Sequence, residues 1–188
     1  MATIKTRMQD ISQLPHELDN EKHECKAIIE TPKGRRNKFK YEPESGLFSL
    51  SNLLPQGFSF PFDFGFIPST LAEDGDALDV IVLMDEPAHV GCLLQVRLVG
   101  VVEIMQKEDG RQSKNDRIIA VAVRSVDYAD VKSISELPRS LVEQAKEFLE
   151  LYNKNSAKQD EVKGVAGPER AIELVEAAIR RFDRKQNT

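Results

Sequence analysis

Several residue types are scarce in this chain, and each shortage excludes a class of protein. There is no tryptophan, there are only two cysteines, and no hydrophobic run approaches the roughly 20 residues that a membrane-spanning helix needs. Cys25 and Cys92 fit no metal-binding or redox spacing, so we expect reduced thiols. Residues 1–13 lack the apolar stretch of a secretory signal. These absences predict a cytoplasmic protein with no membrane partner.

The overall composition is that of a globular protein. Of the 188 residues, 40% are hydrophobic and 30% are charged, which suits one domain over residues 1–188. The formal net charge of −5 argues against a nucleic-acid partner, because phosphate backbones attract basic surfaces. A small phosphate substrate stays compatible with this charge, because a bound metal ion can supply positive charge locally.

The first two thirds of the chain are predicted to form strands. Residues 1–24 are polar and show no period, so we expect an extended arm across the surface. The segments with strand-like composition or alternation are 25–30, 38–42, 47–54, 80–84, 93–103 and 117–123. The run 80–84 is continuously apolar, which predicts a strand buried on both faces. The charged segment 106–116 is predicted to be the loop of a hairpin.

The end of the chain changes to a helical period. Leu137, Leu141, Ala145, Phe148 and Tyr152 recur at helical spacing, with Ser135 placed to cap the helix and Pro138 in its first turn. A second helix is predicted from Gly167-Pro168 to about residue 182, after a polar loop at 153–163. Strands followed by two helices predict an α+β fold, with a small barrel as the way to cover the sheet edges.

An acidic loop precedes the apolar strand. Residues 73–79 read EDGDALD and place four carboxylates within seven positions. Crowded carboxylates repel one another unless a cation lies among them, and their hard oxygens suit Mg²⁺. An EF-hand is excluded, because the fifth and sixth positions of that loop are Leu78 and Asp79 and no helices flank it. A solvated acidic turn remains the alternative to a metal site.

The neighbouring segments narrow this choice. The acidic loop ends the stretch FDFGFIPSTLAEDGDALDV at 62–80, and IIETPKG (28–34) and FKYEPESG (39–46) stand upstream. VGVV at 99–102, IIAV at 118–121 and the helical segment 148–152 follow. In this order, over roughly residues 25 to 182, the segments resemble family I (soluble) inorganic pyrophosphatases. The resemblance implies an OB-like closed β-barrel of about five strands flanked by two C-terminal helices.

The resemblance also implies a reaction and a set of site residues. Members of this family hydrolyse pyrophosphate to two phosphates with several Mg²⁺ ions. The implied metal ligands are Asp74 and Asp79, with Asp76 orienting or deprotonating the attacking water beside the metal and Glu30 reaching a metal through water. The implied phosphate-binding set is Lys40 with its neighbouring acid Glu42, Tyr152, and Arg117 at the position of a lysine. Without the resemblance, Lys40 and Glu42 would read as a surface ion pair and Tyr152 as an aromatic at the edge of the core.

Some positions depart from the family pattern. Asn52 replaces a phosphate-binding arginine, Phe64 replaces a tyrosine, and Asn153 replaces a lysine. In strict register, Lys107 and Asn115 occupy the positions of two metal-binding aspartates. Asp109 or Asp116 is predicted to fill these vacant ligand positions, with Arg35, Arg36 or Arg117 replacing the missing cation. Asparagine cannot reproduce the planar two-pronged donor of an arginine.

Two functions therefore remain open from the sequence. The first is Mg²⁺-dependent hydrolysis of inorganic pyrophosphate or a related phosphoanhydride. The second is a catalytically weakened homologue that binds a metal or phosphate ligand, or acts as an assembly partner. By analogy with the family, we also expect a homo-oligomer, and the short chain favours a hexamer over a dimer.

Overall fold

The protein is built on a curled, closed sheet. The structure, a computed structural model, describes residues 10–108, 110–152 and 158–187. The strands are β1 (Glu24–Thr31), β2 (Asn37–Glu42), β3 (Leu47–Leu53), β4 (Asp63–Ile67), β5 (Leu78–Leu83), β6 (Leu93–Glu108), β7 (Arg111–Lys114), β8 (Arg117–Ala122) and β9 (Lys158–Ala166). The order β1-β4-β5-β8-β6 closes because β6 also pairs with β1. This strongly curled sheet of five strands confirms the predicted OB-like fold.

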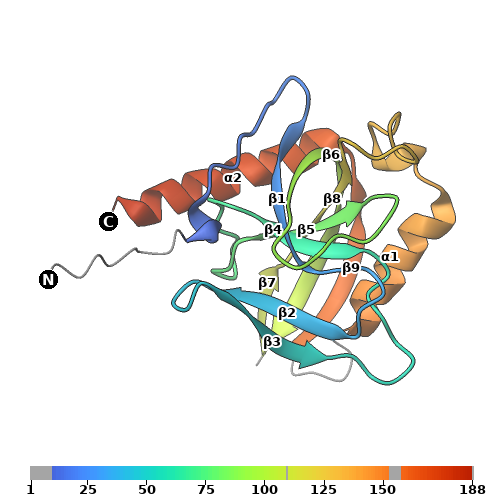
Figure 1. Cartoon of the computed structure of the whole chain (residues 1–188), viewed down its shortest axis with the longest axis horizontal. Coiled ribbons are helices and arrows are strands. Elements are labelled where there is room, and N and C mark those ends of the chain that lie inside the picture. The colour runs from blue at the N-terminus through green and yellow to red at the C-terminus, as the bar shows by residue number, and fades with distance from the viewer. Residues whose placement is uncertain (1–9, 109, 153–157, 188) are drawn as a thin grey trace, which may run out of the picture.

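Two helices cover the sheet, and alternation along the strands decides which residues each helix meets. In β5, Val80 and Val82 belong to the apolar cluster that includes Val175 of α2 (Pro168–Gln186). Ile81 and Leu83 point the other way, into the cluster that includes Leu149 of α1 (Arg139–Tyr152). Figure 1 shows α2 and α1 on different sides of the closed sheet. The predicted strand buried on both faces is therefore confirmed.

The helix ends follow local sequence signals. Gly167 is the N-cap of α2 and Pro168 occupies its first turn, where a missing N–H costs no hydrogen bond. The 3₁₀ helix η2 (Ile134–Glu136) precedes α1, and its capping residue is Ser133, which forms a capping box with Glu136. The prediction that Ser135 caps the long helix was wrong, because Ser135 lies inside η2 and α1 begins only at Arg139.

Three strand predictions need correction. β4 was missed, because Pro61 and Gly65 are typical of turns and argued against a strand, although this short segment is mostly buried. The predicted loop 106–116 contains the end of β6 and all of β7, which pair with each other from Met105 to Lys114. Within the predicted polar loop 153–163, residues from 158 onward belong to β9. Backbone hydrogen bonds to β6 hold this strand in place. The strand therefore does not need apolar side chains, and its sequence lacks the hydrophobic pattern by which a strand is predicted.

The hairpin of β2 and β3 stands away from the closed sheet, as Figure 1 shows, and forms its own two-stranded sheet. The described part of the N-terminal arm, residues 10–23, begins near this hairpin, where the Ile11 amide donates to the Tyr41 hydroxyl, and then runs past α2, where Asn20 donates to Glu176. Its 3₁₀ helix η1 (Ile11–Gln13) brings Ile11 and Leu14 against the small cluster of Ile28, Tyr41 and Phe66. The arm therefore packs along one edge of the fold.

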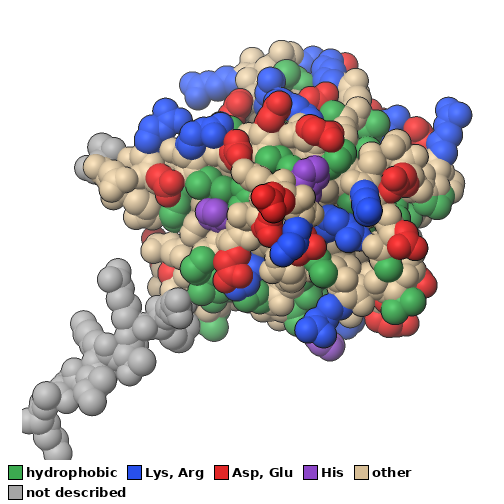
Figure 2. Space-filling view, turned by 90° about the horizontal axis from the view of Figure 1, so that it is seen from above, with side chains coloured by type: hydrophobic (Ala, Val, Ile, Leu, Met, Phe, Trp, Pro, Cys, Tyr) green, Lys and Arg blue, Asp and Glu red, His purple; other side chains and the backbone are tan. Residues whose placement is uncertain are grey.

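The surface carries charges of both signs. On the face seen in Figure 2, acidic and basic side chains are interspersed rather than separated into two regions. Among the described helices, none is long and apolar enough to cross a membrane.

Candidate active site

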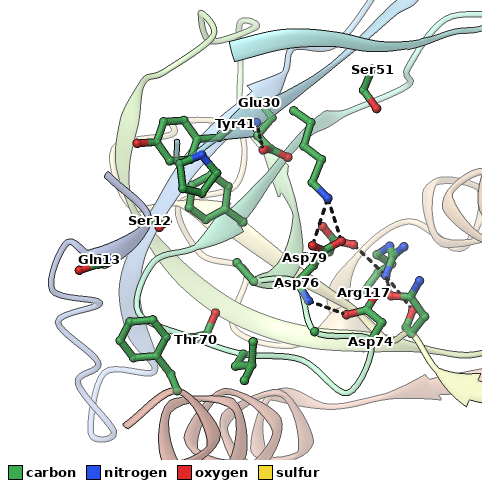
Figure 3. A pocket seen from close by; sticks show the side chains of 18 of the residues that line it. Ser12, Gln13, Glu30, Tyr41, Ser51, Thr70, Asp74, Asp76, Asp79 and Arg117 are labelled. Atoms are coloured by element: carbon green, nitrogen blue, oxygen red, sulfur yellow. Dashed lines mark hydrogen bonds and ion pairs between the residues drawn. The ribbon is translucent and has the colours of Figure 1, made fainter. Parts of the chain in front are cut away.

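A single cavity collects the acidic loop and the residues that face it. Its volume is about 790 Å³, and Figure 3 shows it lying between the hairpin, the acidic loop and the N-terminal arm. The residues at its centre come from β1, β2, the loop before β5, β5 itself, β6 and the start of β8; they are Glu30, Lys40, Asp74, Asp76, Asp79, Gln106, Asn115 and Arg117. Its rim includes Asp10, Ser12 and Gln13 of the arm, Asn52 of β3, and Phe182 and Lys185 of α2.

The acidic loop is fastened at both ends. The buried Thr70 hydroxyl accepts a hydrogen bond from the Leu78 amide at 2.9 Å, which closes the base of the loop. Leu71 is tied to α2 on both sides, since its amide donates to the Ala178 carbonyl and its carbonyl accepts from Arg181 Nε at 2.8 Å. Gly75 takes a φ of +93°, which favours glycine and lets the chain turn between Asp74 and Asp76. The loop is thus held where its carboxylates enter the cavity.

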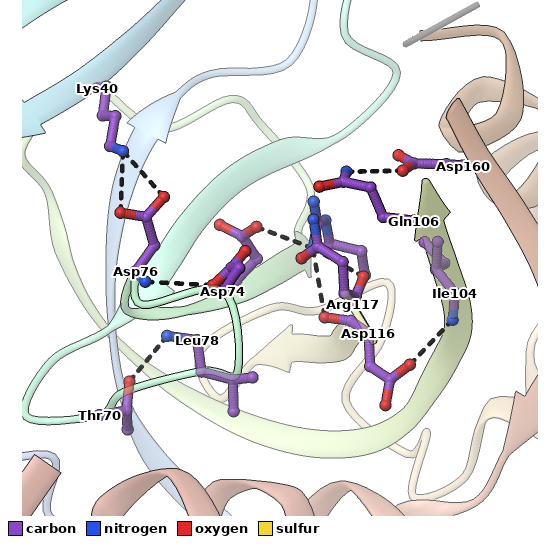
Figure 4. A network of polar contacts seen from close by, with 12 residues as sticks. Lys40, Thr70, Asp74, Asp76, Leu78, Ile104, Gln106, Asp116, Arg117 and Asp160 are labelled. Carbon is purple, nitrogen blue, oxygen red and sulfur yellow. Dashed lines mark hydrogen bonds and ion pairs between the residues drawn. The ribbon is translucent and has the colours of Figure 1, made fainter. Parts of the chain in front are cut away.

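Two of the three aspartates have a cationic partner. Lys40 Nζ lies 3.0 and 2.9 Å from the two carboxylate oxygens of Asp76. Arg117 Nη1 lies 2.9 Å from Asp79 Oδ2, and its side chain is only 11% exposed. Asp74 instead accepts a hydrogen bond from the Asp76 amide at 3.1 Å. Figure 3 shows Asp74, Asp76 and Asp79 gathered beside Arg117, and Figure 4 shows Lys40 reaching Asp76 from the hairpin side.

Glu30 is the carboxyl group most affected by its surroundings. Burial raises its pKa from the ordinary 4.5 to about 7, and the negative charge of Asp79 adds to the rise. The Tyr41 amide donates to Glu30 Oε1 at 2.7 Å, which opposes the rise without cancelling it. Without a cation nearby, Glu30 therefore keeps its proton close to neutral pH.

The pKa values of Asp74 and Lys40 are shifted by burial and by the neighbouring charges. Partial burial raises the pKa of Asp74, and the charges of Asp79 and Asp76 raise it further. Burial disfavours the charged form of Lys40, yet Asp76, Glu30 and Asp79 together raise the pKa of this lysine above its usual value. Glu30 and Asp74 thus have a raised pKa while Lys40 stays charged, and a cation bound beside these two carboxyl groups would favour their ionised forms.

The wall opposite the aspartates consists of amides and a guanidinium. Gln106, Asn115 and Arg117 are at most 9% exposed, although all three are polar. Arg117 Nη1 donates to the Asn115 backbone carbonyl at 2.9 Å and contacts the Asn115 side-chain oxygen as well. Gln106 Nε2 donates to Asp160 Oδ1 of β9 at 2.7 Å. Figure 4 shows the Gln106–Asp160 pair near Arg117 and, separately, the contacts of Arg117 that reach across to the acidic loop.

Comparison with known proteins assigns the family. The model of the family described as inorganic pyrophosphatase matches residues 27–183. The chain belongs to the inorganic pyrophosphatase family. The inorganic pyrophosphatase of Synechocystis sp. is 32% identical over 155 residues, which cover 82% of this chain and 89% of the relative. That of Thermus thermophilus is 36% identical over 158 residues, with 82% and 88% covered.

Solved structures of the family agree with this fold. The crystal structure of the Thermus thermophilus inorganic pyrophosphatase has a TM-score of 0.85 at 31% identity and covers 93% of this chain and 99% of that chain. The inorganic pyrophosphatase of Neisseria gonorrhoeae has a TM-score of 0.81 at 28% identity, with the same shares covered. The identification of the chain from its sequence segments as a family I pyrophosphatase is confirmed.

The structure places the sequence-predicted site residues as follows. Glu30, Lys40, Asp74, Asp76, Asp79 and Arg117 meet at the cavity. Glu42 points elsewhere: it lies on the exposed hairpin, where its Oε1 accepts from Ser49 Oγ at 2.9 Å. The alternative of a Lys40–Glu42 surface pair is wrong, because Lys40 pairs with Asp76. Tyr152 ends α1, and its side chain lies outside the described part of the structure.

Two predicted replacements need correction. Asp116 turns away from the other aspartates, as Figure 4 shows, and its Oδ1 accepts from the Ile104 amide at 2.9 Å. Strand alternation explains this, because Asn115 and Arg117 face the cavity and the residue between them faces away. Arg36 donates to the Leu54 carbonyl, and Arg35 and Arg36 do not line the cavity. Asp109 and Asn153 lie outside the described residues.

The structure contradicts the placement of Lys107 at a vacant ligand position, because Lys107 does not line the cavity. Lys107 is exposed and pairs across β7 with Gln112, whereas the neighbouring Gln106 is buried in the cavity wall. The sequence held the signal, because Val102, Ile104 and Gln106 alternate on one face of a strand. The predicted strand ends at residue 103, whereas β6 continues to Glu108 and carries the alternation to Gln106. Asn52 does line the cavity, and Phe64 packs against Phe60 and Phe148 instead.

The donor set fits a hard divalent cation. Asp74, Asp76, Asp79 and Glu30 offer carboxylate oxygens of the kind that Mg²⁺ prefers. As they stand, no three acidic, histidine or cysteine side chains of the described residues converge closely enough to hold a metal ion. Lys40 pairs with both oxygens of Asp76, and Arg117 pairs with Asp79 Oδ2. A cation that bound through these oxygens would compete with the two basic side chains.

Proposed function

We propose that this protein hydrolyses inorganic pyrophosphate to two phosphates and that the reaction depends on Mg²⁺. The observation that carries this proposal is the meeting of Asp74, Asp76 and Asp79 with Lys40 and Arg117 in one cavity. Phosphoryl transfer needs carboxylates to place metal ions and fixed cations to stabilise charge on the phosphoryl oxygens. Both sets of groups project into the same space here.

The roles follow from position. Asp74 and Asp79 would hold Mg²⁺ directly, and Glu30, on strand β1, would reach it through water. The ion would neutralise the substrate and lower the pKa of a bound water. Asp76 lies at the open side of the group, 60% exposed, where its carboxylate can orient the attacking water and accept its proton. Lys40 and Arg117 would bind phosphoryl oxygens, with Tyr152 as a further phosphate contact.

Substrate binding has a physical consequence for the ion pairs. Lys40 is charged and pairs with Asp76 across a partly exposed gap, so the pair contributes only about 0–1 kcal/mol to stability. A phosphate oxygen can therefore replace Asp76 as the partner of Lys40 at little cost. The exchange would free the Asp76 carboxylate for the attacking water.

The test is phosphate release from pyrophosphate in the presence of Mg²⁺. Asp76→Asn with Asp79→Asn keeps the shape of both side chains and removes both negative charges, so we expect turnover to fall by about a hundredfold or more. Asp130→Asn is the matched control, since Asp130 is exposed and does not line the cavity. Equal release by the wild type and the double variant would contradict the proposal.

We also propose a cytoplasmic homo-oligomer, a hexamer rather than a dimer, with no nucleic-acid or membrane partner. The hexamer is proposed by analogy with the family, from the short length of the chain, which covers 89% of the Synechocystis protein and 88% of the Thermus protein. Large apolar side chains remain exposed on the single chain, among them Leu47, Leu50 and Phe58. The solution mass tests the assembly.

A further inference from the structure

Three consecutive residues before the acidic loop are each tied to a different part of the fold. They belong to residues 69–72, which we call the stem of the loop. Ser69 contacts the N-terminal arm, Thr70 closes the base of the loop by accepting from the Leu78 amide, and Leu71 contacts α2. The position of the three aspartates therefore depends on elements that lie outside the centre of the cavity.

The N-terminal arm holds Ser69 in an unusual backbone conformation. Ser69 has a φ of +52°, in the left-handed region that residues other than glycine seldom adopt. Its amide donates to the Ser12 carbonyl at 2.7 Å, and its hydroxyl donates to the Leu14 carbonyl at 2.8 Å. Such a conformation persists only where the surrounding contacts compensate for its cost. The two hydrogen bonds to the arm are contacts of this kind.

The arm and the acidic loop also share apolar contacts. Ala77 of the loop packs against the same small cluster as Ile11 and Leu14 of the arm. The arm is itself anchored to the closed sheet, since the His16 carbonyl accepts from the Lys26 amide of β1 at 2.7 Å. Residues 11–16 are therefore a fixed support for the loop.

Helix α2 is the second support. The Leu71 amide donates to the Ala178 carbonyl at 3.0 Å, and Arg181 Nε donates to the Leu71 carbonyl at 2.8 Å. Ala72, the next residue of the stem, packs against the apolar cluster that contains Val175 and Ala178. Arg181 itself does not line the cavity, so any effect of this side chain on the site must pass through the stem.

The acidic loop needs such supports. Gly75 lies between Asp74 and Asp76 with a φ of +93°, and glycine gives a loop little rigidity of its own. Two carboxylates bind one ion well only when their separation is fixed. Groups that orient metal ligands without touching the metal commonly contribute a factor of ten to a hundred in metal affinity.

We propose that Ser69 and Arg181 are positioning residues for the metal site: they fix the stem that carries the acidic loop and so set the affinity of the loop for a divalent cation. Neither residue touches the ion or the substrate. The inference rests on the proposed function only in taking the acidic loop as the metal site. Its test is equilibrium binding and needs no turnover, so the two proposals can fail separately.

The experiment is a calorimetric titration of the metal-free protein with Mn²⁺ alone. Arg181→Met keeps the apolar part of the side chain and removes the hydrogen bond to the Leu71 carbonyl. We expect this variant to bind Mn²⁺ about tenfold to a hundredfold more weakly than the wild type. The direction of the change is diagnostic, because the loss of a positive charge would by itself favour the binding of a cation.

Arg180→Met is the matched control. Arg180 precedes Arg181 on α2, is exposed, and its side chain pairs with Glu176 of the same helix. The control removes the same charge and leaves the stem untouched, so we expect its affinity for Mn²⁺ to equal or slightly exceed that of the wild type.

Ser69→Gly tests the support from the arm. Glycine adopts a φ of +52° without strain, so this variant can keep the backbone of the stem while it loses the hydroxyl bond to Leu14. We expect its affinity for Mn²⁺ to fall about tenfold. In both variants the Leu78 amide, which closes the base of the loop, should exchange its hydrogen faster than in the wild type. The Ile104 amide, which donates to Asp116, serves as the reference for opening elsewhere.

Thermal unfolding, measured alongside, checks that each variant is folded at the titration temperature. A merely structural role would lower the unfolding temperature, accelerate exchange at Leu78 and Ile104 alike, and leave the Mn²⁺ affinity of the folded protein unchanged; that result would overturn the inference. Equal weakening by Arg180→Met would overturn it as well. Each residue is judged by its own variant, and Ser69→Gly decides alone if Arg181→Met does not fold.

The wild type separates this inference from the proposed function. A wild type that binds Mn²⁺ and releases no phosphate contradicts the proposed function alone, and weaker Mn²⁺ binding by the two variants then still supports the positioning role. A wild type that binds no Mn²⁺ contradicts both.

Discussion

Replacing Glu30 by glutamine isolates the cost of placing a buried carboxylate in the metal-free site. The folded protein holds the Glu30 proton with a pKa of about 7, against an ordinary value of 4.5. Because the folded-state pKa is the higher one, the unfolded chain loses its proton first, and stability falls as the pH rises through this interval. Below the interval both states are protonated and there is no penalty. Above it the full penalty applies, about 3 kcal/mol at most.

The same linkage gives the expected size of the effect at two pH values. Glu30→Gln keeps an oxygen that can accept the hydrogen bond from the Tyr41 amide, and it stays neutral at every pH. We expect the variant to be more stable than the wild type by about 3 kcal/mol at a pH near 8.5, and by less than about 1 kcal/mol at a pH near 5. Titrating groups that do not interact with Glu30 cancel when the two proteins are compared at each pH.

The assay is urea unfolding of metal-free protein, with Glu44→Gln as the control on the exposed hairpin turn. Adding Mg²⁺ at the higher pH should stabilise the wild type more than the variant, because only the carboxylate gains from a nearby cation. An equal stability difference at both pH values would refute the reasoning, because it would show that Glu30 does not titrate between them in the folded state.

Two further predictions concern the acidic loop and the assembly. Thr70→Val removes the acceptor for the Leu78 amide at the base of the loop, so we expect the free energy of unfolding to drop by about 1–3 kcal/mol and Mn²⁺ to bind more weakly; unchanged stability in urea would show that this bond does not hold the loop. Light scattering should return a mass several times the 21.2 kDa of one chain, six times for a hexamer, and a mass near one chain would contradict the proposed oligomer.

The sequence predicted those elements whose signals are local. The apolar run at 80–84 gave a strand buried on both faces, because four consecutive apolar side chains serve two cores at once. The Gly167-Pro168 pair set the start of α2 to the residue. β9 was missed because it is polar and is stabilised by pairing with β6, a strand more than 50 residues away in the sequence. Pairing over such a distance leaves little trace in local composition.

The site residues also divide into those with a local sequence signal and those that depend on pairing between distant strands. Asp74, Asp76 and Asp79 lie on one loop, so the sequence alone brings them together, and the family resemblance added Glu30 and Lys40. The opposite wall depends on the register between β6, β7 and β8, which decides that Gln106 faces inward and Lys107 outward. A shift of one residue exchanges the two faces of a strand. Matching by sequence register therefore placed the exposed Lys107 at the cavity, where the structure has the buried Gln106. The pairing of Arg117 with Asp79 depends on the parallel neighbours β5 and β8 and could only be seen in the fold.

Phosphate release from pyrophosphate, followed as Mg²⁺ is added to metal-free protein, tests the central claim most directly. The account predicts almost no release before Mg²⁺ is added, sustained release afterwards, and a loss of about a hundredfold or more when Asp76→Asn and Asp79→Asn are combined. Release that is independent of Mg²⁺, or release that survives the loss of both carboxylates, would contradict it.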